Sequence, residues 1–390
     1  MKPTLQDVIC FDPPPSTAKP KDSAQGSLLI FFITGNPGLI AYYRPFLDRL
    51  QSLLCDDEHL RGDRKYCTYG ASLAGFEVNG DDSSKNHSSS VKGAPYGLQE
   101  QIDQVAARLE HVSGSLKSSD GQRVPVILIG HSVGSYILLE IVSKWQQSRQ
   151  KAGQPPFPYD IIGGICLFPT VVDIAKSPTG RRMTPLLNLP AFPTAVHYIA
   201  RPLRWLPFWV VVYLVALVTG MPNNMATITA AFLCSDNGVR QALHMARDEM
   251  HEITHDKFSD DIWGTSGTEG DEGKVLQSKA TAAAAAANMQ ADRSRELHLR
   301  RQTTKLYFYW GKNDRWVADS TRDAILAARA QKATDNHALK RAKPVMEVDQ
   351  HDIPHGFCLN PVHSDLVAKK VANWIQEITT NHVSHQRNAL

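Results

Sequence analysis

A pentapeptide of the form G-x-S-x-G is the part of this sequence best suited to nucleophilic chemistry. It reads Gly130-His131-Ser132-Val133-Gly134, directly after the apolar run 126–129 and before the apolar run 136–139. A strand, a sharp turn and a helix hold such a serine in a strained conformation, with its hydroxyl exposed above a sheet. Glycines on both sides let the helix approach the strand closely. The pattern predicts that Ser132 is a nucleophile.

A serine hydroxyl needs a base to remove its proton, and the base is usually a histidine that a carboxylate orients. Asp314 follows one late apolar run and His355 follows the next, just ahead of the last helical pattern. The order serine, acid, histidine is the one in which such triads occur on α/β sheets. We therefore predict a triad of Ser132, Asp314 and His355. Three further residues stay open as alternatives for the base or the acid: His351, Asp173 and Asp319.

Acyl transfer also needs N–H donors for the developing oxyanion. The N–H group of Val133, which follows the nucleophile, is one candidate. The second is expected from the loop 34–38, where Pro37 has no N–H group and Asn36 is the predicted donor. A plain turn at this loop is the alternative interpretation.

The elements that must position these residues are buried parallel strands, which read as apolar runs with helical patterns between them. Apolar residues repeat with helical spacing from 98 to 112 and again after Pro361, where Asn360 is the expected N-cap. We predict an α/β fold with a mostly parallel sheet flanked by helices. The predicted strands are 28–33, 66–71, 124–129, 161–167, 306–310 and 345–348.

Composition bounds the possible functions. The 390 residues include 42% hydrophobic and 21% charged residues, which excludes global disorder. A net charge of +3 is too small for bulk nucleic-acid binding, so no nucleic-acid partner is expected. Six scattered cysteines favour a reducing compartment, and residues 1–20 do not read as a secretory signal. The chain is therefore expected to fold in the cytosol.

About 140 residues separate the predicted strands 161–167 and 306–310, which is far more than an ordinary connection. The expected organisation is a core over 1–167, an apolar cap or membrane-associating insert over 168–263, a low-complexity linker over 264–301 and a second core part over 302–390. A polar segment over 79–93 is expected to be a surface loop.

The apolar insert has the composition of a membrane-contacting segment. Residues 205–234 carry no charge, and Arg201 and Arg204 are the only charged residues in 183–235. The apolar cluster is too short to span a bilayer comfortably, which favours a segment in one leaflet or a hairpin turning at 221–224. A closed cap over an acyl pocket is the alternative. The residues expected to meet the membrane are Trp205, Phe208, Trp209, Tyr213, Leu214 and Leu217.

Two other patterns suggest different chemistry. His251-Glu252-Ile253-Thr254-His255 matches H-E-x-x-H, a zinc motif when both histidines share a helix face. No third ligand follows at a recognised spacing, and a solvated helix face is the preferred interpretation, so no metal is predicted. Cys358 lies close to His355 and is interpreted as a small packing residue.

Several of these segments together resemble a known family. Residues 34–38 with Tyr42 and Tyr43, residues 130–136, and residues 167–170 with 177–180 are similar to the lipid droplet-associated hydrolases of the α/β-hydrolase superfamily, in a fungal or plant-type form. Thr34 departs from the superfamily, where a histidine often precedes the oxyanion glycine.

The resemblance implies a serine hydrolase, without cofactor, on the cytosolic face of the lipid droplet monolayer and endoplasmic reticulum membrane. Its implied substrates are sterol esters or other neutral lipids, and its implied triad matches Ser132, Asp314 and His355. A weakly active or non-enzymatic lipid-surface protein is the main alternative. A lipid acyltransferase or a thioesterase is a further one.

Overall fold

The structure is a computed structural model, and it describes most of the chain. The described residues are 4–11, 27–56, 65–78, 93–116, 123–150, 157–258, 262, 304–331 and 343–387. The predicted linker 264–301 and nearly all of the predicted surface loop 79–93 lie outside them.

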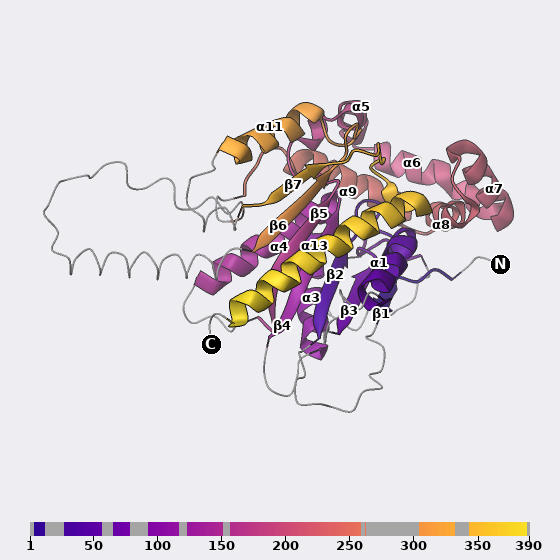
Figure 1. Ribbon diagram of the computed structural model, residues 1–390. Helices are drawn as coiled ribbons and strands as arrows, with labels where there is room; N and C mark the ends of the chain where they lie inside the picture. The colour runs from indigo at the N-terminus through magenta and orange to yellow at the C-terminus, as the bar shows by residue number, and fades with distance from the viewer. Residues whose placement is uncertain are drawn as a thin grey trace, which may run out of the picture.

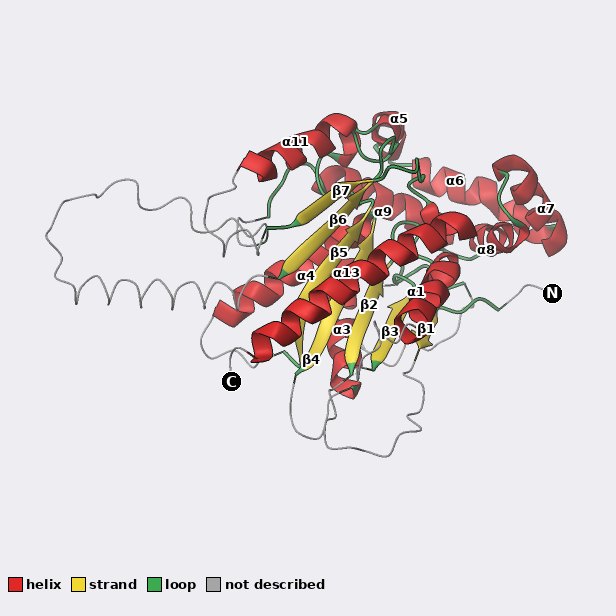
Figure 2. Ribbon diagram, viewed as in Figure 1, coloured by secondary structure: helices red, strands yellow, loops and turns green. Residues whose placement is uncertain are grey.

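The described strands form one seven-stranded sheet in the order β1-β3-β2-β4-β5-β6-β7. Only β1 runs antiparallel to its neighbour, and the remaining pairs are parallel (Figure 2). The strands are β1 (Val8–Phe11), β2 (Leu28–Ile33), β3 (Tyr66–Ala71), β4 (Val124–His131), β5 (Tyr159–Leu167), β6 (Lys305–Trp310) and β7 (Val345–Val348).

Helices cover both faces of the sheet, which is why its central strands are apolar throughout. Helices α1 (Arg44–Asp56) and α13 (Pro361–Arg387) lie on one face, and α3 (Leu98–Ser115) and α4 (Val133–Gln150) lie on the other (Figure 1). Every residue of β2 is buried between these layers. The remaining core elements are η1 (Ile40–Tyr43), α11 (Asp319–Gln331) and η5 (Phe357–Leu359).

The described part of the segment between β5 and β6 consists of helices joined by turns and loops, and these helices gather beyond the carboxyl ends of the strands (Figure 1). We call these helices the cap. They are η3 (Ile174–Lys176), α5 (Pro178–Leu187), α6 (Phe192–Ala200), η4 (Arg201–Trp205), α7 (Phe208–Thr219), α8 (Asn223–Leu233) and α9 (Gly238–Glu252).

The predicted α/β-hydrolase fold is confirmed, and so are all six predicted strands, with small extensions at β4, β5 and β6. Asn360 caps α13 as expected, because its side-chain oxygen accepts the N–H of Val362 at 2.8 Å. Sequence reasoning missed the edge strand β1. Only Ile9 of its four residues is buried, so β1 lacks the continuous apolar run of the inner strands.

Candidate active site

Ser132 sits at the sharp turn between β4 and α4. Its backbone has φ of 55°, in the left-handed region that non-glycine residues rarely occupy. A Cβ atom on Gly134 would come within 2.6 Å of the backbone oxygens of Ile33 and Thr34, and one on Gly130 would collide with Gly134. Both glycines are therefore required by the close approach of α4 to the sheet, as the G-x-S-x-G pattern predicts.

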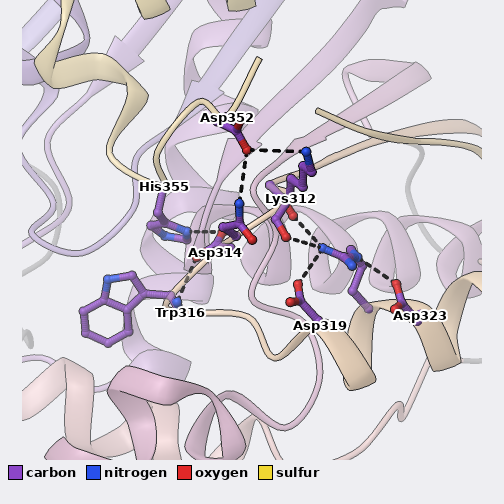
Figure 3. Close-up of polar contacts among 10 residues, drawn as sticks. Lys312, Asp314, Trp316, Asp319, Asp323, Asp352 and His355 are labelled. Atoms are coloured by element: carbon purple, nitrogen blue, oxygen red, sulfur yellow. Dashed lines mark hydrogen bonds and ion pairs between the residues drawn. The ribbon is translucent and has the colours of Figure 1, made fainter. Parts of the chain in front are cut away.

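Ser132, His355 and Asp314 form one hydrogen-bonded chain although they are distant in sequence. Nε2 of His355 lies 2.9 Å from Oγ of Ser132, and Nδ1 of His355 lies 2.7 Å from Oδ2 of Asp314. A carboxylate only accepts hydrogen bonds, so Nδ1 carries the proton and Nε2 is free to accept the serine hydroxyl. Oδ1 of Asp314 accepts the N–H of Trp316 at 2.8 Å, and Figure 3 shows this carboxyl facing the His355 ring.

A buried carboxylate holds the loop that carries His355. Asp349 is fully buried directly after β7, and its two oxygens accept the hydroxyl of Tyr309 and the N–H of Ile353, each at 2.6 Å. Tyr309 belongs to β6, the strand that leads to the Asp314 loop. Asp349 thus connects the loop that carries His355 to β6 through hydrogen bonds, a role that the sequence does not reveal.

Polar contacts also hold the loop that carries Asp314 (Figure 3). Arg322 of α11 donates from Nη1 to the carbonyl oxygens of Gly311 and Lys312 at 2.9 and 3.0 Å. Asp352, in the histidine loop, accepts a hydrogen bond from Asn313 at 3.1 Å. The acid and histidine loops are therefore fixed to each other and to α11.

His131, the residue before the nucleophile, links the histidine loop to the loop 34–38. Its Nε2 lies 2.9 Å from the carbonyl oxygen of His355, so Nε2 must donate and Nδ1 must accept the Tyr43 hydroxyl, 2.7 Å away. Tyr43 in turn accepts the N–H of Gly35 at 3.0 Å. Burial, and next the nearby His355, hold the pKa of His131 well below its usual range, which keeps the ring neutral as this arrangement requires.

The two segments that carry the predicted oxyanion donors, the start of α4 and the loop 34–38, both adjoin Ser132. Val133 is the first residue of α4, so its N–H is one of those without an intrahelical acceptor. The loop 34–38 packs against the serine, since a Cβ on Gly35 would lie 3.0 Å from Cβ of Ser132. The side chain of Asn36 points to the cap, where Nδ2 donates to the carbonyl of Ala242 at 3.0 Å and to Oε1 of Glu249 at 2.9 Å.

The residues considered as alternative acids or base of the triad are not hydrogen-bonded to Ser132 or His355 in the contacts described above. His351 is exposed at the surface. Asp173 pairs with Lys176 at 2.9 Å, and Asp319 pairs with Arg322 at 2.7 Å. The structure brings only His355 and Asp314, among the candidates considered, into one hydrogen-bonded chain with Ser132.

The H-E-x-x-H motif does not present two histidines on one helix face. Helix α9 ends at Glu252, and His255 lies beyond that end. His251 bonds through Nε2 to the side-chain oxygen of Asn188 at 2.8 Å. Cys358 is buried, and burial raises the pKa of its thiol to about 12, so it is a packing residue without thiolate character at neutral pH.

The cap exposes large apolar side chains on α7 and the turn before it. Trp205 is 87% exposed and Trp209 is 72% exposed, and Tyr213 and Leu217 continue this exposed row at intervals of four residues. Leu214 is also exposed, whereas Phe208 is half-buried and packs against the core. The opposite face of α7 is covered by α8 (Figure 1).

Among the described helices, none is by itself long and apolar enough to cross a bilayer. The pair α7 and α8 passes such a test jointly on length and composition, and the two helices meet at a bend of 114°. The turn between them falls at residues 220–222, next to the position predicted for a hairpin.

Solved structures that this chain is similar to include a loop variant of a haloalkane dehalogenase from Bradyrhizobium elkanii. It is 12% identical, with a TM-score of 0.48, and the match covers 98% of this chain and 100% of that one. An epoxide hydrolase from Vigna radiata is 14% identical, with a TM-score of 0.44 and coverage of 91% and 92%.

The sequence comparisons identify a particular family. The family profile described as lipid-droplet associated hydrolase matches residues 26–270 and 271–358. Proteins named lipid droplet-associated hydrolase from Homo sapiens and Gallus gallus are 34% and 28% identical over 41% and 58% of this chain. The chain spans 43% and 63% of the length of these two relatives. Because the family profile matches most of its residues, the chain belongs to the lipid-droplet associated hydrolase family.

Proposed function

We propose that this protein is a serine hydrolase that works at lipid surfaces and cleaves carboxylic esters of lipids. The observation that carries the proposal is the unbroken hydrogen-bonded chain from Asp314 through His355 to Ser132. Membership of the lipid-droplet associated hydrolase family supports hydrolysis as the class of reaction. In this proposal Ser132 is the nucleophile, His355 the base, and Asp314 the residue that orients His355.

The geometry supports a two-step reaction. The Ser132 hydroxyl attacks the ester carbonyl carbon while its proton moves to Nε2 of His355, and Asp314 stabilises the imidazolium through Nδ1–H. The N–H groups of Val133 and Asn36 stabilise the oxyanion. The imidazolium then protonates the leaving alcohol, and a water molecule activated by His355 cleaves the acyl-enzyme to the free acid. No step of this mechanism requires a cofactor.

The exposed apolar row of α7 supports a lipid surface as the place of action. Side chains such as Trp205 and Trp209 gain free energy when they leave water for the boundary between headgroups and acyl chains. Arg201 stands next to this row, where it can reach anionic headgroups, whereas the neighbouring Arg204 pairs with Asp236. The proposed locations are the lipid droplet monolayer and the cytosolic face of the endoplasmic reticulum membrane, with sterol esters or other neutral lipids as substrates.

The test is hydrolysis of a panel of esters by the full chain and by a Ser132→Ala variant. The panel contains an emulsified cholesteryl ester, an emulsified triacylglycerol and a short p-nitrophenyl ester. The wild-type chain should hydrolyse at least one of them, and the variant should be slower by a factor on the order of 10³ or more. Equal rates for the two chains on every hydrolysed ester would contradict the proposal.

The second candidate is a lipid-surface protein with weak or no enzymatic activity. The extent of exposed apolar surface on α7 favours it, since this surface does not depend on the triad. It predicts that both chains bind the emulsion and that neither hydrolyses any ester. Acyl transfer and thioester hydrolysis would pass through the same acyl-enzyme, and adding an acceptor alcohol or a thioester substrate to the panel distinguishes them.

A further inference from the structure

Glu249 is an unusual residue for the interior of the cap. It lies near the end of α9, on the side that faces the loop 34–38, and it is only 4% exposed. A buried carboxyl is costly unless it is hydrogen-bonded, and its Oε1 accepts the amide of Asn36 at 2.9 Å. Burial, partly offset by this bond and reinforced by Asp248, raises its pKa to about 8. Glu249 has no part in the proposed proton transfers.

The contact partner of Glu249 is one of the predicted oxyanion donors. Asn36 uses its side-chain Nδ2 for two hydrogen bonds, one to Glu249 and one to the carbonyl of Ala242. Ala242 and Glu249 are seven residues apart on α9, which places them on the same helix face two turns from each other. The amide of Asn36 is thus held at two points along one face of a cap helix.

This attachment constrains the backbone of Asn36 as well as its side chain. The other side of the loop is held by Gly35, which packs against Ser132 and donates to Tyr43. A residue fixed at both its side chain and its neighbouring peptide has little freedom to rotate its own N–H group. An oxyanion donor is effective only when it points at the developing charge before the reaction begins.

We propose that Glu249 is a positioning residue, which orients the oxyanion-stabilising loop by holding the side chain of Asn36 against the cap helix α9. This inference rests on the proposed serine-hydrolase function. It assigns the cap a part in catalysis, since α9 supplies the acceptors that fix a loop of the core. It also explains why a carboxyl persists in an apolar environment: a leucine of similar size would leave one donor of Asn36 unpaired.

The test compares three variants of the full chain on the best ester of the panel. Glu249→Leu removes the acceptor, Asn36→Ala removes the donor, and Glu249→Gln keeps an acceptor oxygen at the same place. Losing an oxyanion donor costs roughly 10²–10³ in kcat, and misplacing one should cost about 10- to 100-fold. We expect this loss for Glu249→Leu and Asn36→Ala, with KM changed by less than about threefold, and near wild-type kcat for Glu249→Gln.

A double variant separates positioning from general damage. If Glu249 acts only through Asn36, the Asn36→Ala/Glu249→Leu chain should be no slower than the slower single variant. The midpoint of the pH–rate profile should stay at its wild-type value, because His355 is untouched. Should Glu249→Leu fail to fold, Asn36→Ala and Glu249→Gln still test the inference, since they change the other partner or preserve the contact.

The control is Glu252→Ala, an exposed residue on the same helix, which should keep wild-type kinetics. The inference is overturned if folded Glu249→Leu keeps wild-type kcat, if the two single losses add in the double variant, or if Glu249→Gln is as slow as Glu249→Leu. Ser132→Ala is assayed in parallel. Retained activity in that variant would overturn the proposed function itself, whereas an inactive Ser132→Ala with a fully active Glu249→Leu overturns only the positioning by Glu249.

Discussion

The free energy of unfolding should fall more steeply with rising pH in the wild-type chain than in a Glu249→Gln variant. Burial raises the pKa of Glu249 from 4.5 to about 8, so between these pH values the folded chain keeps a proton that the unfolded chain releases. The stabilisation from Glu249 is therefore fully present below the pKa of this residue in the unfolded chain. It is lost as the pH rises through the pKa of this residue in the folded chain. Glutamine does not titrate, and the variant lacks this contribution.

The expected size follows from the two pKa values. One pKa unit corresponds to about 1.4 kcal/mol, so the interval from 4.5 to about 8 amounts to about 5 kcal/mol in total. Between pH 5 and pH 8, where most of this change falls, the wild-type chain should lose about 3 to 4 kcal/mol more than the variant. Asp7, whose pKa burial also raises, contributes equally to both chains and cancels in the difference.

Urea unfolding at pH 5, 6.5 and 8, followed by circular dichroism, measures this difference. A Glu252→Gln variant is the matched control, because Glu252 is exposed on the same helix and should shift the curve by less than about 0.5 kcal/mol at each pH. Parallel pH dependences for wild type and Glu249→Gln would contradict this prediction, since they would mean that Glu249 carries the same charge in the folded and unfolded chains.

Three further predictions concern the triad, the loop 34–38 and the lipid surface. Asp314→Asn should lower kcat by about 10³- to 10⁴-fold without unfolding the chain, because the amide no longer fixes the proton of His355 on Nδ1. Ester hydrolysis measures the loss of kcat, and thermal melting shows whether the chain stays folded. A loss below tenfold would contradict this prediction. Tyr43→Phe leaves the Gly35 N–H without its acceptor and should cost about 1 to 3 kcal/mol of stability in urea unfolding, whereas an unchanged midpoint would show that this buried bond contributes nothing. The double variant Trp209→Asp/Tyr213→Asp should weaken flotation with a lipid emulsion by at least tenfold, while hydrolysis of a short soluble ester is retained. Undiminished flotation would exclude this face of α7 as the lipid contact.

The sharp turn that carries Ser132 is predictable from sequence because its determinants are local. A buried strand, two glycines and a helix follow one another directly in the sequence, and the structure shows the sharp turn that this order predicts. The inner strands are predictable for a similar reason, since burial on both faces demands continuous apolar runs. β1 is not predictable in this way, because it is an edge strand in which only Ile9 is buried, and it carries no such run.

The partners of Ser132 are harder to predict from the sequence, because loops are positioned by contacts that a linear pattern does not contain. His351 and His355 lie four residues apart in one loop, and order along the chain alone could not separate them. The loop that carries His355 is held by Asp349 and Asp352. Asp349 accepts a hydrogen bond from β6, and Asp352 accepts one from the loop that carries Asp314. Neither aspartate stands out in the sequence.

The contact between Asn36 and Glu249 lies beyond sequence reasoning altogether. The two residues are 213 positions apart, and Glu249 belongs to a helix with other charged residues that read as a solvated face. Only the packing of α9 over the loop 34–38 turns this glutamate inward. The contact therefore depends on how the cap sits on the core, which neither segment encodes locally.

Peptide mapping after labelling with a fluorophosphonate tests whether Ser132 is the activated nucleophile. The reagent phosphonylates a serine only when a neighbouring base removes its proton. We expect a single adduct on the peptide that contains Ser132, none in Ser132→Ala, and labelling at least 100-fold slower in His355→Ala. An adduct on a different residue, or labelling of Ser132 at the same rate without His355, would contradict this expectation.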